Sequence, residues 1–73
     1  MKRLRYRIFD PEQGKFLKRA TQIGGDPRVL LTEWTHHRER AQWFPGAASA
    51  RSMRDKLGGA LLIYNDRGVA LSD

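Results

Sequence analysis

The sequence predicts an α+β fold, in which an antiparallel sheet of four or five strands carries one helix on one face. Three observations support this prediction. The stretch "LRYRIF" (residues 4–9) alternates apolar and basic residues, and a period of two is typical of a half-buried strand. "DPEQGK" (10–15) has proline and glycine where a hairpin turn needs them. "AASARSMRDKL" (47–57) has apolar residues at helical spacing and is followed by Gly58, a common helix terminator. Strands joined by short turns are antiparallel neighbours, so this order indicates one sheet with the helix packed against it.

The first hairpin has a register that can be derived from its turn. If residues 11–14 form a loop closed by Asp10 and Lys15, Phe9 faces Phe16. Continued along the strands, this register gives the pairs Ile8–Leu17, Arg7–Lys18 and Tyr6–Arg19. One face of the hairpin is then apolar and suited to the core, and it comprises Leu4, Tyr6, Ile8 and Leu17. The other face is basic with aromatic residues at its tip, and it comprises Arg3, Arg5, Arg7, Lys18, Phe9 and Phe16.

Residues 27–44 allow two interpretations. The dipeptide "DP" at 26–27 is a good helix start, and apolar residues recur at helical spacing after it. Against a helix, the β-branched residues and the tryptophan of "VLLTEWT" (29–35) prefer strands. We favour a strand that runs through Trp34, followed by a short turn and an extended "AQWF" (41–44). One long helix over 27–44 remains the alternative.

The last part of the chain is expected to add two strands. "ALLIY" (60–64) reads as a buried strand, "NDRG" (65–68) as a turn with glycine at its left-handed position, and "VALSD" (69–73) as a short final strand. We expect one core that comprises Tyr6, Ile8, Met53, Leu57, Leu61 and Ile63. A chain this small needs its large side chains inside, so Trp34 and Phe44 are also expected in the core. Trp43 is equally compatible with the core and the surface.

The length and composition restrict the class of protein. A chain of 73 residues is enough for one small domain, here spanning 1–73, and leaves no room for a second core. It contains no cysteine, which excludes disulfides and cysteine-based zinc sites. The longest apolar run, "GGALLI" (58–63), is too short for a membrane span or a signal-peptide core. We therefore expect a soluble cytoplasmic domain with no membrane association.

Several stretches together resemble a known type of protein. "YRIFDPEQGKFL", then Trp34-Thr35 with Ala41, Phe44 and Ala50 at later spacings, then "LLIYNDRG", are similar to a layout common among very short phage and prophage proteins. The resemblance implies an accessory factor in a bacterial host cell. Members of this type with known roles include anti-CRISPR proteins, which inhibit host defence by occupying a host complex. The shared positions are packing and turn positions, so no functional residue is carried over.

The stretch "EWTHHRER" (33–40) is the natural place to look for catalysis or metal binding. Glu33 and His37 would share one face of a helix. The adjacent His36 and His37 point apart on either a helix or a strand, and no third ligand stands at metal-site spacing. No nucleophile motif accompanies them, and "GGD" and "LGGA" match no nucleotide-binding fingerprint. We expect no catalytic residues, no metal and no cofactor.

The excess positive charge is concentrated at the start of the chain. Residues 1–20 carry a net charge of +5 out of a total of +6, and small basic proteins favour anionic partners. Alternate residues of a strand lie about 6–7 Å apart, so the arginines of the hairpin would form a ladder near the spacing of successive phosphates. We therefore predict a non-enzymatic protein that contacts the DNA or RNA backbone, with little sequence specificity, through Arg3, Arg5, Arg7, Lys18, Phe9 and Phe16.

Other side chains would extend this face if the fold brings them near it: Arg38, Arg40, Trp43, Arg51, Arg54, Lys56 and Arg67. Two alternatives stay open. The basic face can be a solvated edge that merely prevents edge-to-edge aggregation. The second alternative is a protein-binding inhibitor, of the anti-CRISPR kind, that docks on an acidic surface of a host defence or nucleic-acid-handling complex.

Overall fold

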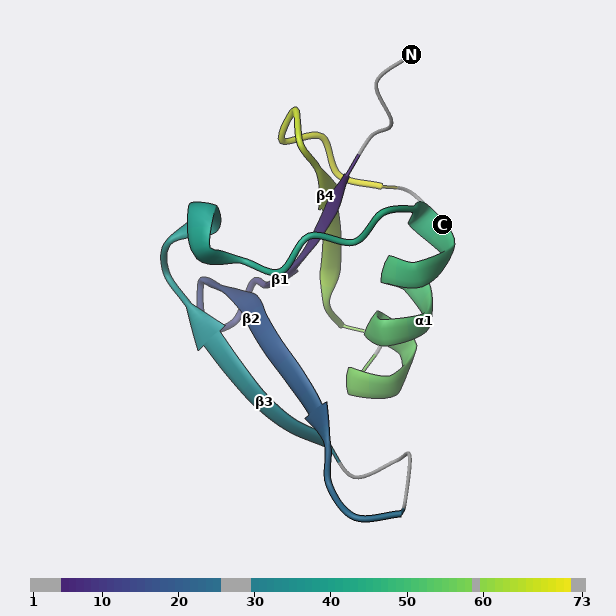
Figure 1. The fold of residues 1–73 in the computed structure, drawn as a ribbon. Helices are drawn as coiled ribbons and strands as arrows, with labels where there is room; N and C mark the ends of the chain where they lie inside the picture. Colours follow the sequence, from purple (N-terminus) through teal and green to yellow (C-terminus); the bar gives the residue numbers. More distant parts are fainter. Residues whose placement is uncertain (1–4, 26–29, 59, 72–73) are drawn as a thin grey trace.

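Four strands and one α-helix make up the described part of the chain, which covers residues 5–25, 30–58 and 60–71 of the computed structural model. In chain order the elements are β1 (Tyr6–Asp10), β2 (Lys15–Gln22), β3 (Leu30–Thr35), the 3-10 turn η1 (Arg38–Arg40), α1 (Ala47–Leu57) and β4 (Leu62–Asn65). The strands form one antiparallel sheet in the order β3-β2-β1-β4, and α1 lies beside β1 and β4 (Figure 1). The predicted α+β class is confirmed in its four-stranded form.

The hairpin between β1 and β2 has the predicted turn. The backbone N–H of Gly14 donates to the carbonyl of Asp10 at 2.8 Å, and Gly14 has a φ of 67°, which favours glycine. The Asp10 carboxylate accepts a second bond from the N–H of Glu12 at 2.9 Å. The register pairs Phe9 with Phe16 and Asp10 with Lys15, as the loop length predicts.

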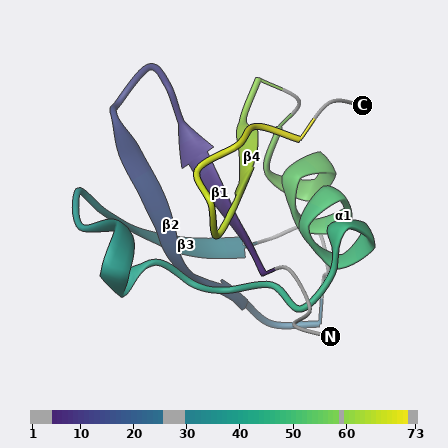
Figure 2. The same cartoon turned by 90° about the horizontal axis from the view of Figure 1, so that it is seen from above.

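Beyond these two pairs the strands β1 and β2 separate. Tyr6 and Phe44 exchange two backbone hydrogen bonds of 3.0 and 2.8 Å, and the N–H of Gln42 donates to the carbonyl of Leu17 at 2.9 Å. The segment between η1 and α1, residues 41–46, therefore enters between the two strands, and we call it the connector. Figure 1 and Figure 2 show its course from η1 past β1 to α1. The connector lies beside Tyr6, where the predicted register had placed Arg19 of β2.

The structure contradicts three predicted pairs of the hairpin: Ile8 with Leu17, Arg7 with Lys18 and Tyr6 with Arg19. These pairs do not form because β2 has an irregularity between Leu17 and Arg19, and a bulge bends a strand and increases its twist. Arg19 pairs instead with Glu33 of β3, and its side chain forms an ion pair with the Glu33 carboxylate at 3.4 Å. The partner of β2 after its first residues is β3, not β1.

The hydrophobic core lies between α1 and the sheet. Its buried members are Ile8, Leu17, Phe44, Ala50 and Ile63. Partly buried side chains pack around them: Tyr6, Ala20, Trp34, Met53, Leu57, Leu61 and Leu71. All six predicted core residues belong to this cluster, and so do Trp34 and Phe44. The helix has the predicted bounds, 47–57, and Ala50 is its buried residue.

The alternative of one long helix over 27–44 is wrong for the residues that the structure describes. Residues 30–35 form β3, which pairs with β2 along its length, and a single turn, η1, follows. Within β3 the indole N–H of Trp34 donates to the hydroxyl of Thr32 at 3.0 Å. Pairing with β2 satisfies the backbone of this segment, so the strand preference of its β-branched residues prevails.

The chain after β4 turns back as predicted but forms only a bridge within residues 69–71. The Asn65 side chain accepts from the N–H groups of Arg67 and Val69 at 2.9 and 3.0 Å, and Gly68 has a φ of 79°. Ala70 bridges Tyr64, in place of the predicted fifth strand. The rest of that predicted strand, like Arg3 and Leu4, lies outside the described residues. Across 5–25, 30–58 and 60–71, the helices are too short and too polar to cross a membrane.

Candidate nucleic-acid interface

The odd-numbered residues at the start of β1 point to the side of the sheet that α1 does not cover. Tyr6 and Ile8 belong to the core, so the alternation of the strand directs Arg5, Arg7 and Phe9 to the opposite side. Neighbouring strands extend this side, since Arg7 pairs with Tyr64 of β4 and Phe9 pairs with Phe16 of β2. The sheet thus brings basic and aromatic residues from three strands together.

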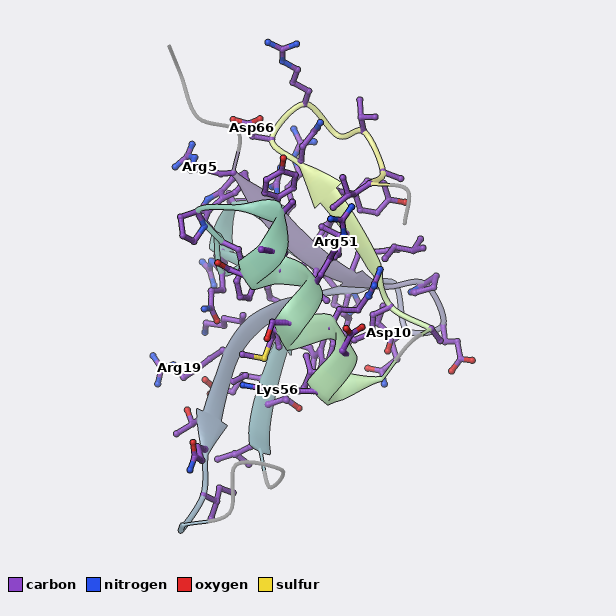
Figure 3. The ribbon with its side chains drawn as sticks, turned by 90° about the vertical axis from the view of Figure 1, so that its right-hand side faces the viewer. Arg5, Asp10, Arg19, Arg51, Lys56 and Asp66 are labelled. Atoms are coloured by element: carbon purple, nitrogen blue, oxygen red, sulfur yellow. The ribbon has the colours of Figure 1, made fainter. Side chains whose placement is uncertain are left out.

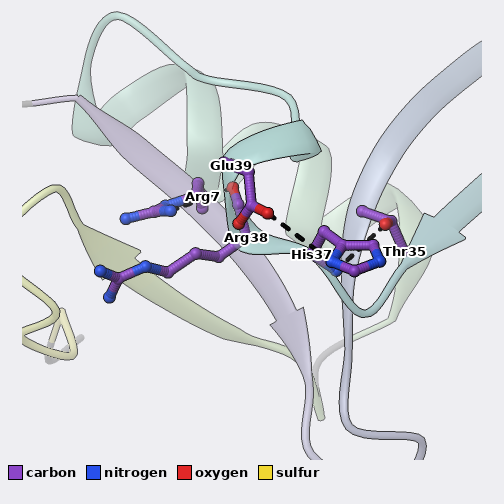
Figure 4. A network of polar contacts seen from close by, with 5 residues as sticks. All are labelled: Arg7, Thr35, His37, Arg38 and Glu39. Atoms are coloured by element: carbon purple, nitrogen blue, oxygen red, sulfur yellow. Dashed lines mark hydrogen bonds and ion pairs between the residues drawn. The ribbon is translucent and has the colours of Figure 1, made fainter.

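Arg7 is buried, with 5% of its surface exposed, and the prediction of an exposed arginine ladder is wrong at this position. The reason is the turn η1, which lies over the strand. The Arg7 Nη1 donates to the backbone carbonyl of Arg38 at 3.0 Å (Figure 4). The guanidinium carbon also lies 4.0 Å from the centre of the Trp43 ring, a cation–π geometry. Trp43 comes from the connector, which the sequence pattern gave no reason to place here.

Arg5 shares the same tryptophan but stays exposed. Its guanidinium carbon is 4.4 Å from the centre of the Trp43 ring. Trp43 therefore packs against two cations rather than in the core, which decides between the two locations expected for it. Two guanidinium groups around one ring place a concentrated positive charge at the beginning of β1.

A shallow cavity of about 240 Å³ opens next to Arg7. Its lining comprises Arg7, Phe9, Phe16, Arg38, Tyr64 and Gly68. The rings pack on one another: the Phe9 ring centre lies 4.8 Å from that of Phe16 and 5.8 Å from that of Tyr64, the latter edge to face. The cavity thus has aromatic walls and two arginines, and its described lining contains no acidic side chain.

The charge of Arg7 is incompletely compensated. Its Nε is buried and has no hydrogen-bond partner. Burial lowers the pKa of the Arg7 guanidinium, and the positive charges of Arg38 and Arg5 lower this pKa further, against opposing effects of Asp66 and Glu39. A guanidinium nevertheless stays protonated in proteins. An anion bound at the cavity would therefore offset an existing repulsion between two arginines.

We call this set the Arg7 surface, and it comprises Arg5, Arg7, Phe9, Phe16, Arg38, Trp43 and Tyr64. Of the residues predicted from the sequence, the structure brings together Arg5, Arg7, Phe9 and Phe16, with Arg38 and Trp43 from the additional set. Tyr64 was missed by the sequence analysis. Its alternation with the buried Ile63 in "LLIYN" was the signal that could have placed it on this side.

The other predicted residues lie elsewhere. Lys18 is exposed at the irregularity of β2, and Arg40 is exposed on η1 outside the cavity lining. Arg51, Arg54 and Lys56 belong to α1, which Figure 3 shows in front of the sheet and which packs on its other side. Arg54 forms an ion pair with Asp55 at 3.4 Å. Arg67 is exposed in the turn next to Gly68, and Arg3 lies outside the described residues.

The two histidines do not form a site within the described residues. Both are exposed, and His37 directly precedes η1. Its N–H donates to the Thr35 hydroxyl at 3.1 Å, and its Nδ1 lies 3.6 Å from a Glu39 carboxylate oxygen (Figure 4). Among residues 5–25, 30–58 and 60–71, no three histidine or acidic side chains gather as metal ligands would.

Comparisons of the chain with protein-family models, with curated proteins and with solved structures gave no significant match. The chemistry of the Arg7 surface is therefore the basis on which a function can be assigned.

Proposed function

We propose that this protein is a non-enzymatic nucleic-acid-binding domain that uses the Arg7 surface and has little sequence specificity. The observation that carries the proposal is the buried, incompletely hydrogen-bonded guanidinium of Arg7, which is stacked on Trp43 and lines a cavity with aromatic walls and a second arginine. Burying a charge is costly unless it is paired and hydrogen-bonded, so an anion at the cavity would supply Arg7 with a partner of opposite charge.

The composition of the Arg7 surface fits a nucleic acid. Arginine matches the geometry of a phosphate and stacks on planar rings, and aromatic side chains accept bases of any sequence because every base has a π face. Base edges are read by hydrogen-bonding side chains, most often arginine on guanine, and also asparagine, glutamine or a carboxylate. In the described lining of the cavity the side chains of this kind are Arg7 and Arg38, and we assign both to a phosphate, which supports low sequence specificity.

The broader role that we propose is that of a phage-type accessory factor. The resemblance of its sequence layout to short phage and prophage proteins supports this role, as does the small size of the domain. The alternative, a docking protein that inhibits a host complex, is one possible outcome of the binding experiments.

Fluorescence anisotropy with labelled oligonucleotides tests the proposal. Binding should weaken as salt rises, because bound arginines release counterions from the phosphates. Arg38→Ala should reduce the slope of log K against log[salt] by about one, while keeping the backbone carbonyl that accepts from Arg7. Lys56→Ala is the matched control, since it also removes one exposed cation but lies on α1.

Two results would contradict the proposal. Equal changes of slope for Arg38→Ala and Lys56→Ala would mean that net charge alone drives association. An absence of oligonucleotide binding, together with a protein partner from bacterial lysate that is retained after nuclease treatment, would favour the acidic host complex instead.

A further inference from the structure

We infer that the cavity of the Arg7 surface receives one unpaired nucleotide of a single strand, with its base against the aromatic walls and its phosphate at Arg7 and Arg38. This inference rests on the proposed function and adds the class of nucleic acid. Three features of the site support it: the depth of Arg7, the size and walls of the cavity, and the placement of the two guanidinium groups.

The burial of Arg7 argues against a duplex as the bound form of nucleic acid. In a duplex the phosphates lie on the outside of a stiff rod, so side chains that contact them normally project from the protein surface. Arg7 is 5% exposed and is held back by the carbonyl of Arg38 and the ring of Trp43. A single strand is flexible and can turn one nucleotide inward, so it can bring a phosphate to a recessed guanidinium.

The cavity has the size and the walls for a single base. Its volume of about 240 Å³ is below the roughly 300–1,000 Å³ of sites that enclose larger ligands, and so suits one flat ring system. The rings of Phe16 and Tyr64 lie on either side of Phe9, within 5.8 Å of it, and both are half-buried. A base in a duplex is already stacked on its neighbours and cannot use these rings, whereas an unpaired base can.

The two guanidinium groups supply hydrogen-bond donors and positive charge to the phosphate. A guanidinium has five N–H donors, and Arg7 commits one of them to the Arg38 carbonyl. Arg38 is exposed at the rim of the cavity, so its charge is accessible to a phosphate that approaches from outside. A nucleotide is a ligand in which a flat ring and an anion are joined at a short distance. The arrangement of aromatic walls and arginines at one cavity matches that combination.

The test compares an oligothymidylate of about 20 nucleotides with a duplex of the same length, both labelled, at one salt concentration. We expect the single strand to bind about tenfold or more tightly. A duplex carries the higher charge density, so this preference cannot come from electrostatic attraction alone. Tyr64→Leu, which keeps an apolar side chain but removes the ring, should weaken single-strand binding about tenfold and duplex binding by clearly less.

Two controls keep the result interpretable. Leu31→Ala changes an exposed apolar side chain on β3, outside the cavity, and should leave both affinities unchanged. Far-ultraviolet circular dichroism checks that Tyr64→Leu is folded, and if it is not, Arg38→Gln tests the phosphate half of the site with the same two probes. Arg38→Gln should then weaken single-strand binding more than duplex binding.

The outcomes separate this inference from the proposed function. Equal affinity for both probes, with no effect of Tyr64→Leu, would overturn the single-strand inference and leave nucleic-acid binding intact. Binding of neither probe at low salt would overturn the proposed function and this inference with it.

Discussion

Arg7 combines a structural contact with the proposed binding role. Its side chain joins β1 to η1 through one hydrogen bond and packs on Trp43. Replacing buried ionic groups by apolar side chains of similar volume often costs little, because the desolvation of the charge disappears with its interactions. A methionine at position 7 would keep most of the apolar length of the arginine and leave only the Arg38 carbonyl without its donor. The binding role and the structural role of this arginine can therefore be separated experimentally.

Our first prediction is that Arg7→Met changes the free energy of unfolding by less than about 1 kcal/mol and abolishes oligonucleotide binding. Urea denaturation and anisotropy measure the two effects. A loss of stability above about 3 kcal/mol would show instead that Arg7 is kept mainly for the fold, and this would remove the main observation behind the proposed function.

The second prediction concerns the core residue Ile63, which is 1% exposed in β4. Ile63→Val removes one methylene group and keeps a β-branched side chain, so it should lower the free energy of unfolding by about 0.5–1.5 kcal/mol. Val69→Ala, at a position that is 59% exposed, should change it by less than about 0.5 kcal/mol. Similar losses in urea denaturation for both variants would contradict the packing of α1 over β4.

At the scale of the elements, the hairpin turn depends on a backbone conformation that favours glycine. Gly14 has a φ of 67° with open space around its α-carbon, whereas Gly25 has equally open space and no positive φ. Gly14→Ala should therefore lower the free energy of unfolding by about 1–2 kcal/mol, and Gly25→Ala by clearly less. Thermal or urea unfolding of the pair isolates the backbone effect. Equal losses would mean that the turn adopts another conformation.

The connector is the element that gives the Arg7 surface its shape. It bonds to both β1 and β2 where these strands separate, and it carries Trp43 to the arginines and Phe44 to the core. The side chains of these two adjacent aromatic residues thus lie on opposite sides of the sheet, as alternation along an extended segment requires. The same segment that completes the core therefore also places Trp43 against the two arginines at the start of β1.

At the scale of the whole molecule, the question is whether the position of the charge matters or only its amount. The chain carries a formal net charge of +6. Arg5→Glu with Arg38→Glu should abolish oligonucleotide binding at moderate salt, because both exposed cations lie on the Arg7 surface. Lys18→Glu with Lys56→Glu changes the net charge equally at exposed positions outside the cavity lining, and should weaken binding only slightly.

Anisotropy at several salt concentrations, with circular dichroism of both double variants, distinguishes these possibilities. If the control pair abolishes binding to the same extent, the protein attracts nucleic acid by its overall charge and the Arg7 surface has no special part in it.

The sequence by itself determined the elements whose signals are local. The period of two in "LRYRIF", the proline and glycine of the hairpin turn, and the helical spacing of 47–57 each lie within a few consecutive residues, and all three were read correctly. The membership of Arg5, Phe9 and Phe16 in the basic and aromatic side of the hairpin follows from the same alternation.

Only the tertiary structure decided the burial of Arg7, the place of Trp43 and the cavity. The contact that buries Arg7 joins residues 31 positions apart, and the connector that supplies Trp43 enters between two strands that the hairpin register had paired throughout. Such contacts are set by how β2 leaves β1 to follow β3, which depends on the bulge and twist of the strands. They leave no period in the sequence, because the residues that meet belong to different elements.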